Sequence, residues 1–241
     1  MQLDFSYLIR TFWLCVKAVP VTLEITIVSL LLAIIPALFI ALARIYHVKV
    51  IEQLCSIFVS FIRSTPIVLQ ILIVYSIMPS LLNSFVKSAG WSFNVFEMNP
   101  VIYAFVVFGI NSSASLSEVF RSAISSVNRG QLEAALSIGE THFQAFRRVV
   151  LPQAAVSALP NLCSTTVILI KNTSLAFMMT VREITGIAKI EAAYGYNYVE
   201  SYIDIFIIYI AVCILVELIF KKIDRRVVFA GVRRVKTNLR S

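Results

Sequence analysis

Polar side chains recur at helical spacing inside otherwise apolar stretches of this 241-residue chain. Ser164 and Thr165 follow Asn161 by three and four residues, so a helix would present all three on one face. Asn111 and Ser115 have the same four-residue spacing. Such groups can hydrogen-bond a polar solute, and polar groups inside a membrane often mark a solute path. They also serve as hydrogen-bonding contacts between helices, so both interpretations stay open.

Three more polar residues lie within or near apolar stretches, namely Arg63, Gln70 and Lys171. The two cations could hold a substrate carboxylate. They could instead pair with a glutamate, or extend their charged ends to the membrane surface. The glutamates available for such pairing are Glu24, Glu118 and Glu217. The candidate solute path therefore comprises Arg63, Gln70, Asn111, Ser115, Asn161, Ser164, Thr165 and Lys171.

A basic loop at about 122–152 carries the signals of two short helices joined by a tight turn. Asn128, followed three residues later by Gln131, resembles a capping box that begins the first helix. Gly139 occupies the position where a helix-ending residue with positive φ is expected. Thr141 and Gln144 repeat the capping pattern for the second helix. We call these two predicted helices and their turn, residues 128–152, the wedge.

The composition of the wedge suits contact with another protein. Glu133 falls near the first turn of its helix, where a negative charge is favourable. Ala134 and Ala135 keep one side slim, so that a partner surface can approach closely. The second helix is expected to run to about Leu151 and to end at Pro152. The alternative is that both helices simply lie on the membrane surface.

The elements that carry these residues are predicted to be membrane spans. The chain is 59% hydrophobic and only 14% charged, which excludes an ordinary soluble domain. Four charge-free runs cover residues 25–43, 64–86, 98–117 and 149–170. Since about 20 apolar residues cross a bilayer, we predict an all-α integral membrane protein with five transmembrane helices. The expected spans are about 20–43, 54–78, 101–120, 154–175 and 202–220.

The basic residues cluster at span ends, so the net charge of +8 reflects membrane topology rather than nucleic-acid binding. With the N-terminus outside, the inner segments hold 14 of the 21 Lys and Arg residues and the outer segments hold 5. The positive-inside rule therefore predicts N-terminus out and C-terminus in. The lipid bilayer is the expected surroundings of this chain.

The predicted organisation has three parts. Residues 1–19 form a short interfacial helix, because charges and Trp13 interrupt its apolar sequence. Residues 20–225 form the transmembrane domain, which includes the loop at about 122–152. Pro20 is expected in the first turn of span one, and Pro66 lies inside span two, where Ser64 or Thr65 can satisfy the freed carbonyl. Residues 226–241 form a basic cytoplasmic tail.

Enzymatic signatures are absent from the sequence. No glycine is followed by lysine, so the phosphate-binding pattern G-x-x-x-x-G-K-[ST] does not occur. The patterns H-E-x-x-H and G-x-S-x-G are also missing, and no Cys/His spacing suggests a metal site. The four cysteines are interpreted as packing residues. We therefore expect no enzyme activity and no cofactor in this chain.

The loop as a whole resembles the EAA loop of ABC importer permeases, in the spacing of Glu133-Ala134-Ala135, Gly139, Val149 and Leu151-Pro152. Other segments resemble the polar amino acid uptake subfamily: EVFRSAI at 118–124, GQLEAA at 130–135, LPQA at 151–154, FIRSTP at 61–66 and KNTSL at 171–175. The resemblance covers about residues 20–225. The chain departs from the subfamily at 111–115, where Asn and Ser replace small apolar residues and glycine.

The resemblance implies a type I importer permease with a MetI-like fold in a bacterial cell membrane. It further implies an ABC ATPase dimer that binds ATP and Mg²⁺, a second permease chain, identical or homologous, and an extracellular or periplasmic substrate-binding protein. The coupling residues toward the ATPase would be Glu133, Ala134, Ala135, Gly139, Leu151 and Pro152. The cargo would be a polar or near-neutral amino acid, with cystine favoured by the motifs around span three.

Three alternatives are kept beside this interpretation. The same fold could carry another small polar solute. An ion-coupled secondary transporter would be expected to show inverted repeats, and none is evident in the sequence. A membrane scaffold would move nothing and would recruit no ATPase.

Overall fold

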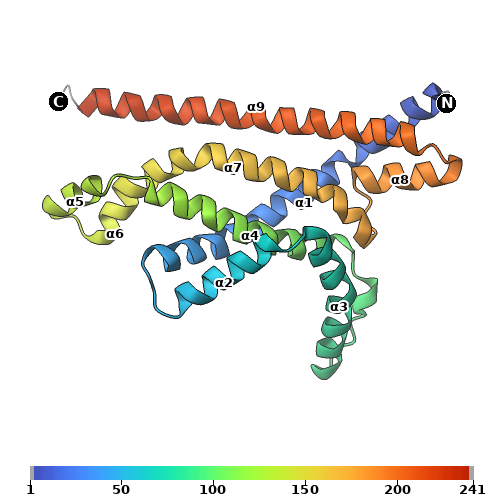
Figure 1. Cartoon of the computed structure of the whole chain (residues 1–241), viewed down its shortest axis with the longest axis horizontal. Helices are drawn as coiled ribbons and strands as arrows, with labels where there is room; N and C mark the ends of the chain where they lie inside the picture. The colour runs from blue at the N-terminus through green and yellow to red at the C-terminus, as the bar shows by residue number, and fades with distance from the viewer. Residues whose placement is uncertain (1–2, 239–241) are drawn as a thin grey trace.

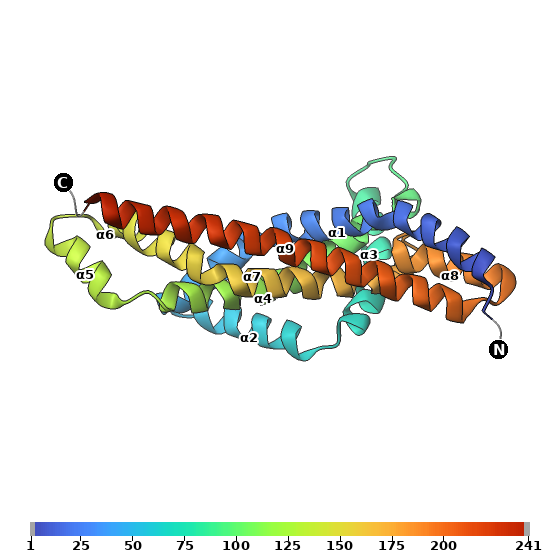
Figure 2. The same ribbon diagram turned by 90° about the horizontal axis from the view of Figure 1, so that it is seen from above.

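The computed structural model describes residues 3–238, and every regular element in that range is helical. Its long helices lie lengthwise beside one another, with the two termini at opposite ends of the bundle (Figures 1 and 2). The α-helices are α1 (Phe5–Ile45), α2 (Ile51–Ser64), α3 (Ile67–Ser88), α4 (Val101–Ser125), α5 (Arg129–Ser137), α6 (His142–Ala145), α7 (Leu151–Thr173), α8 (Ile184–Gly195) and α9 (Tyr198–Asn238). Shorter turns are η1 (Val95–Glu97), the π-helical η2 (Phe146–Val150) and η3 (Ser174–Met179).

Five helical segments in the described part are long and apolar enough to cross a membrane. They are Phe5–Ile45, Ile67–Ser88, Val101–Ser125, His142–Met179 and Tyr198–Arg226. The predicted all-α class with five spans is therefore confirmed. Of the predicted basic tail, residues 226–238 continue α9 as helix, and residues 239–241 lie outside the described residues.

The first span begins earlier than expected. Asp4 accepts hydrogen bonds from the N–H groups of Ser6 and Tyr7, which starts a continuous helix of 41 residues. Pro20 therefore lies inside the helix rather than in its first turn, and that part of the prediction is wrong. The turns before it are held by packing, because Cys15 is fully buried in a cluster with residues of α7, α8 and α9. The interfacial location of residues 1–19 stays a prediction.

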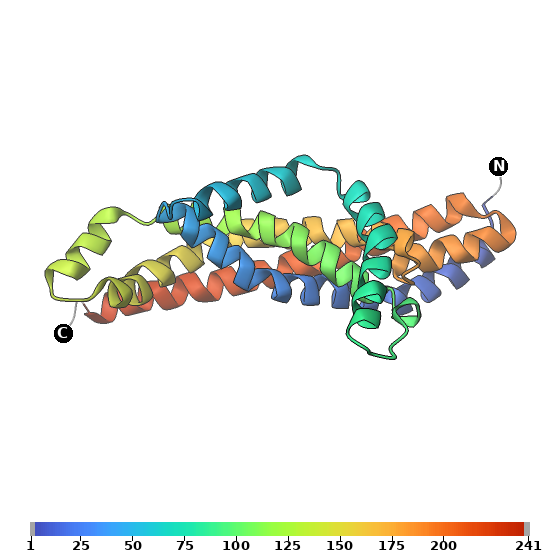
Figure 3. The same cartoon turned by 90° about the horizontal axis from the view of Figure 1, so that it is seen from below.

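Span two is broken rather than continuous. Thr65 has an extended backbone, with φ −98° and ψ 136°, because a residue before proline avoids the helical region. The predicted single helix over 54–78 is therefore wrong: α2 ends at Ser64 and α3 begins at Ile67. Figures 1 and 3 show α3 running across the direction of the long helices.

The centre of the bundle is α4, which packs along α1 on one side and along α7 on another. Small side chains allow the close approach of α1 and α4: Ala33 and Ala37 of α1 are fully buried, and Gly109 of α4 lies against Ser29. The serines of α4 also allow close packing, since the hydroxyls of Ser113 and Ser117 donate hydrogen bonds to carbonyls of their own helix. The polar middle of this span is thus partly a packing surface.

Helix α8 packs against both α1 and α9 at the end of the bundle opposite the wedge (Figure 1). It begins at Glu183, a fully buried carboxylate that accepts the N–H groups of Thr185 and Gly186 at 2.9 and 2.8 Å. The hydroxyl of Tyr209 on α9 donates to the same carboxylate at 2.9 Å. Burial raises the pKa of Glu183 to about 7, although these three hydrogen bonds oppose the shift. Glu183 therefore joins α8 to α9.

Candidate functional site

The wedge lies at the bundle end where α9 also terminates, and it is built from α5, α6 and η2 (Figure 1). Helix α5 closes on Gly139, whose φ is 89°. The N–H of Gly139 donates to the Leu136 carbonyl at 3.0 Å, and the N–H of Glu140 donates to the Ala135 carbonyl at 3.2 Å. This bond pair is a Schellman closure, in which glycine takes the left-handed position at low cost. The predicted turn at Gly139 is confirmed.

The two helix starts in the wedge differ from each other. Thr141 and Gln144 form the predicted capping box, with bonds of 2.9 and 3.3 Å in the two directions. Asn128 caps α5 through its side-chain oxygen, which accepts the N–H of Gly130 at 2.8 Å. The return bond that a capping box would draw from Gln131 is not among the hydrogen bonds of the described residues. Asn128 is therefore a simple N-cap, and the capping box predicted with Gln131 does not form within the described residues.

The second wedge helix does not end at Pro152, contrary to the prediction. The chain passes through the π turn η2, and the N–H of Leu151 donates to the carbonyl of Phe146, five residues back. The wider π turn relieves the contact between the Pro152 ring and the carbonyl that would otherwise lie behind it. Pro152 sits in the first turn of α7, where a missing N–H costs little. The wedge is thus continuous with the fourth span.

The outer surface of the wedge is apolar where a partner could cover it. Ile138 and Phe143 are 82% and 71% exposed, far above what packing inside this chain would give. Glu133 and Ala134 are exposed, whereas Ala135 is buried within the wedge. The predicted slim face is therefore formed by Ala134 alone. Leu151 and Pro152 are exposed at the base of α7.

A small polar hollow lies between α4 and α7, with a volume of about 60 Å³. We call it the polar hollow, and its lining residues are Asn111, Ser112, Ser115, Thr165, Ile168, Leu169 and Asn172. It brings together three of the predicted path residues, Asn111, Ser115 and Thr165. No charged side chain lines it. It is large enough for a polar head group and water, but small for a whole amino acid.

Gln70 reaches this region through hydrogen bonds. The two N–H donors on its Nε2 face three acceptors, the carbonyls of Ile62 and Thr65 at 2.9 and 3.1 Å and the Thr65 hydroxyl oxygen at 2.8 Å. Its Oε1 accepts Nδ2 of Asn111 at 3.1 Å. Thr65 Oγ1 also donates to the Ile62 carbonyl at 3.3 Å, which is the carbonyl that Pro66 leaves without an N–H, as the sequence suggested.

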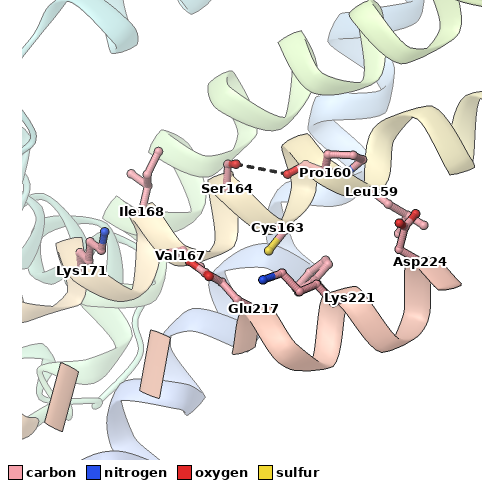
Figure 4. A pocket seen from close by; sticks show the side chains of 11 residues that line it. Leu159, Pro160, Cys163, Ser164, Val167, Ile168, Lys171, Glu217, Lys221 and Asp224 are labelled. Atoms are coloured by element: carbon pink, nitrogen blue, oxygen red, sulfur yellow. Dashed lines mark hydrogen bonds between the residues drawn. The ribbon is translucent and has the colours of Figure 1, made fainter. Parts of the chain in front are cut away.

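The remaining predicted path residues lie elsewhere. Ser164 and Lys171 are among the residues that line a separate groove of about 430 Å³ between α7 and α9, which we call the α7–α9 groove (Figure 4). Glu217 and Lys221 line the same groove. The Ser164 hydroxyl donates a hydrogen bond to the Pro160 carbonyl of its own helix at 3.2 Å. Asn161 is exposed on the surface of α7. The expected single face of Asn161, Ser164 and Thr165 is therefore divided.

Pairing with a glutamate was one of three possibilities that the sequence left open for Arg63 and Lys171, and it is not seen among the described residues. Neither Arg63 nor Lys171 forms an ion pair with another described residue, and both side chains are exposed. Glu118 pairs instead with Arg44 of α1 and with Arg121, the latter at 2.8 Å. Glu118 thus links α1 to α4 near the wedge.

Ser112 and Asn172 are polar residues that line the hollow but are not among the predicted path residues, which include Lys171 beside Asn172. Spacing could have identified Asn172, which follows Thr165 by seven residues, or two helical turns.

No group of three or more His, Cys, Asp or Glu side chains within the described residues could hold a metal ion. Cys15, Cys55 and Cys213 are buried free thiols, and Cys163 is half-buried.

The chain is similar to transport proteins over most of its length. Residues 29–229 match the model of a family described as binding-protein-dependent transport system inner membrane component. The L-cystine transport system permease protein TcyL of Bacillus subtilis is 37% identical over 208 residues, covering 86% of this chain and 84% of that protein. A solved structure titled "Crystal structure of an amino acid ABC transporter with histidines" is similar at 29% identity and a TM-score of 0.78, covering 94% of this chain and all of that one. The MetNI methionine ABC transporter in an inward facing conformation shares the fold at 19% identity and a TM-score of 0.67, covering 89% of this chain and 96% of that one.

Proposed function

This chain belongs to the family of binding-protein-dependent transport system inner membrane components, and we propose that it is the permease half of an importer driven by a separate ATPase dimer. It is a membrane subunit of an amino-acid ABC transporter. In the proposed complex the ATPase dimer binds ATP and Mg²⁺, and this chain contributes no hydrolytic residue. The surrounding membrane is the bacterial plasma membrane, with the N-terminus outside and the wedge inside.

The observation that carries the ATPase proposal is the exposed wedge. Two capped helices close on Gly139, and Ile138 and Phe143 beside the turn expose most of their apolar surface. An aromatic and an aliphatic side chain exposed together are typical anchors for a pocket on another protein. Because the second wedge helix continues into α7 without a break, a push on the wedge would move the fourth span directly.

We propose that the solute passes along the face that includes the polar hollow. A second permease chain, identical or homologous, would complete the path, and an external binding protein would deliver the solute. ATP binding would then shift the population between inward-open and outward-open states, since a ligand shifts an equilibrium toward the state that it binds more tightly. The roles of Arg63, Asn161, Ser164 and Lys171 along this path stay a prediction.

The chemistry of the polar hollow supports a solute with little net charge. Asn111, Ser115, Thr165 and Asn172 offer neutral donors and acceptors, which suit a polar or near-neutral amino acid. Cystine is the favoured cargo, because the similar TcyL is named an L-cystine permease and the span-three motifs resemble cystine permeases. Another small polar solute of similar size would fit the same lining.

The proposal is tested by isolating the chain with the proteins that bind it. We expect an ATPase to co-purify and the reconstituted complex to take up radiolabelled L-cystine only when ATP and a cognate binding protein are present. Competition by an excess of other unlabelled amino acids then ranks the cargo. Absence of any associated ATPase would contradict the proposed drive, whereas strong competition by a different amino acid would change only the cargo.

A further inference from the structure

The break in span two leaves a carbonyl without its helical partner. In a continuous helix the Ile62 carbonyl would accept the N–H of residue 66, but Pro66 has none. The side chain of Gln70 supplies the missing donor, since its Nε2 lies 2.9 Å from that oxygen. The same nitrogen also reaches the Thr65 carbonyl at 3.1 Å. Gln70 is therefore the cap of a broken membrane helix, and its donors are already used.

This cap fixes which way the Gln70 amide points. Carbonyl oxygens can only accept hydrogen bonds, so the end of Gln70 that faces two of them must be the NH₂ group. The other end is then the oxygen Oε1, which can only accept. Asn111 lies 3.1 Å from that oxygen and must present its own NH₂ group there. The orientation of both amides follows from the two backbone carbonyls of the break.

Because Asn111 donates through Nδ2 to Gln70, the acceptor oxygen Oδ1 is the end of its amide that does not face Gln70, and its second N–H makes no hydrogen bond with another described residue. The Oδ1 oxygen also forms no hydrogen bond with another described residue, and Asn111 lines the polar hollow. The Ser115 and Thr165 hydroxyls, which can also accept, likewise form no side-chain hydrogen bond within the described residues. The polar hollow therefore offers acceptor oxygens in a space of about 60 Å³ that suits a charged head group.

We propose that Gln70 is a positioning residue that turns the Asn111 oxygen toward the polar hollow, so that this hollow receives the ammonium group of the transported amino acid. The inference rests on the proposed function, because it assumes that the polar hollow belongs to the solute path. It adds the orientation of the bound amino acid, with its ammonium group in the polar hollow. This orientation would depend on the helix break. The carboxylate and side chain of the amino acid would extend outside the polar hollow.

The test compares an amino acid with an analogue that lacks the amino group. The purified permease–ATPase complex, without binding protein, is titrated with L-cystine and with 3,3′-dithiodipropionate, and separately with L-glutamine and 4-carbamoylbutanoate. We expect the wild type to prefer each amino acid by about tenfold or more, the order expected for a hydrogen bond to a charged group. Gln70→Glu should remove most of that preference, because a carboxylate cannot donate to the two carbonyls.

Two further variants separate positioning from general damage. Asn111→Leu by itself should abolish the preference for the amino acid over its deaminated analogue. Adding Gln70→Glu to it should then cause no further loss, since both substitutions act through the Asn111 oxygen. Thr166→Val, next to Thr165 but with its hydroxyl bonded to the Leu162 carbonyl and outside the polar hollow, is the matched control and should keep the full preference. Should Gln70→Glu fail to assemble with the ATPase, Gln70→Met removes the same donors without adding a charge.

An unchanged preference in Gln70→Glu or Gln70→Met, or additive losses in the double variant, would overturn the inference. A wild type that binds the deaminated analogues as tightly as the amino acids would overturn it too. Either result leaves the proposed function standing if ATP-dependent uptake of an amino acid is intact. Failure of the proposed function is a different result, in which the wild type takes up no amino acid at all.

Discussion

At the scale of single residues, two neighbours in α7 have different surroundings. Thr165 lines the polar hollow beside α4, whereas Ser164 lines the α7–α9 groove and satisfies its hydroxyl on its own helix. A rotation of 100° per residue is enough to separate them. The chemistry available to a solute at Thr165 is therefore absent at Ser164, although the two hydroxyls are alike in type.

Replacing Thr165 with valine tests this difference. Thr165→Val keeps the shape of the side chain but removes its hydroxyl from the polar hollow. We expect the apparent affinity for the transported amino acid to fall by about three- to tenfold, with assembly unchanged, which is the usual range for one hydrogen bond. Uptake kinetics in proteoliposomes measure this. Equal losses in Thr165→Val and the control Thr166→Val, whose hydroxyl lies outside the polar hollow, would contradict the assignment of the polar hollow.

Glu183 gives a prediction about pH. It lies between the fourth and fifth candidate spans, and its pKa is about 7 in the folded chain against an ordinary value of 4.5. Between these two values the folded chain binds more protons than the unfolded chain, so stability should fall as pH rises from about 4.5 to about 7. The full loss is on the order of 3 kcal/mol, since one pKa unit corresponds to about 1.4 kcal/mol.

The measurement is the thermal midpoint of the purified chain in detergent between about pH 5 and about pH 8. Glu183→Gln should flatten this dependence, because the amide can still accept from the N–H groups of α8 but does not ionise. Glu191→Gln is the matched control, since Glu191 lies on the same helix in an ion pair with the exposed Arg10. A wild-type midpoint that rises over this range would contradict the prediction.

At this scale the sequence predicted which side chains are polar, but not how each helix is rotated. Thr165 and Asn111 were placed on the path by spacing alone, and the structure does bring them together at one hollow. The rotation of α7 about its axis depends on which face packs against α4 and which against α9. That choice is made by contacts between distant segments, and no local pattern encodes it. For the same reason Lys171 was named in place of Asn172.

At the scale of elements, the wedge and the helix break were predicted with different success. Capping residues and a glycine have strong local preferences, so the turn at Gly139 could be predicted from the sequence. Prolines are less decisive, because Pro20, Pro36 and Pro160 all lie within continuous helices. The break occurs at Pro66, where Thr65 and Gln70 provide alternative partners for the freed carbonyls.

The coupling role of the wedge is tested at Gly139. A valine there would have to adopt a φ near 89°, at a local cost of about 1–2 kcal/mol or more. We expect Gly139→Val to insert and assemble but to lose ATP-dependent uptake by about tenfold relative to ATP hydrolysis, since the turn joins the two wedge helices. The ratio of uptake to hydrolysis in proteoliposomes is the measurement.

Gly90 provides a matched control for this substitution. It also has a positive φ, 73°, and an added Cβ would meet no atom within 4 Å at either glycine. Gly90 lies beyond the end of α3, away from the wedge, so Gly90→Val introduces similar backbone strain without altering the proposed docking surface. A similar loss of coupling in both variants would show that strain alone, and not the wedge, explains the effect.

At the scale of the whole molecule, the long helices connect two different ends. One end carries the exposed wedge, and the other carries α8, which packs against both α1 and α9 (Figure 1). The polar hollow lies between α4 and α7, the same pair of helices that leads toward the wedge. This arrangement suits a permease in which a partner acts on one end and a solute passes along the helices.

The most direct test of this account is to compare the two energy sources in the same reconstituted vesicles. The chain, its co-purified ATPase and a cognate binding protein are supplied either with ATP and no ion gradient, or with a proton or sodium gradient and no ATP. The account predicts amino acid uptake with ATP alone and none with a gradient alone. Uptake driven by a gradient without ATP, or by the chain without its ATPase, would contradict it.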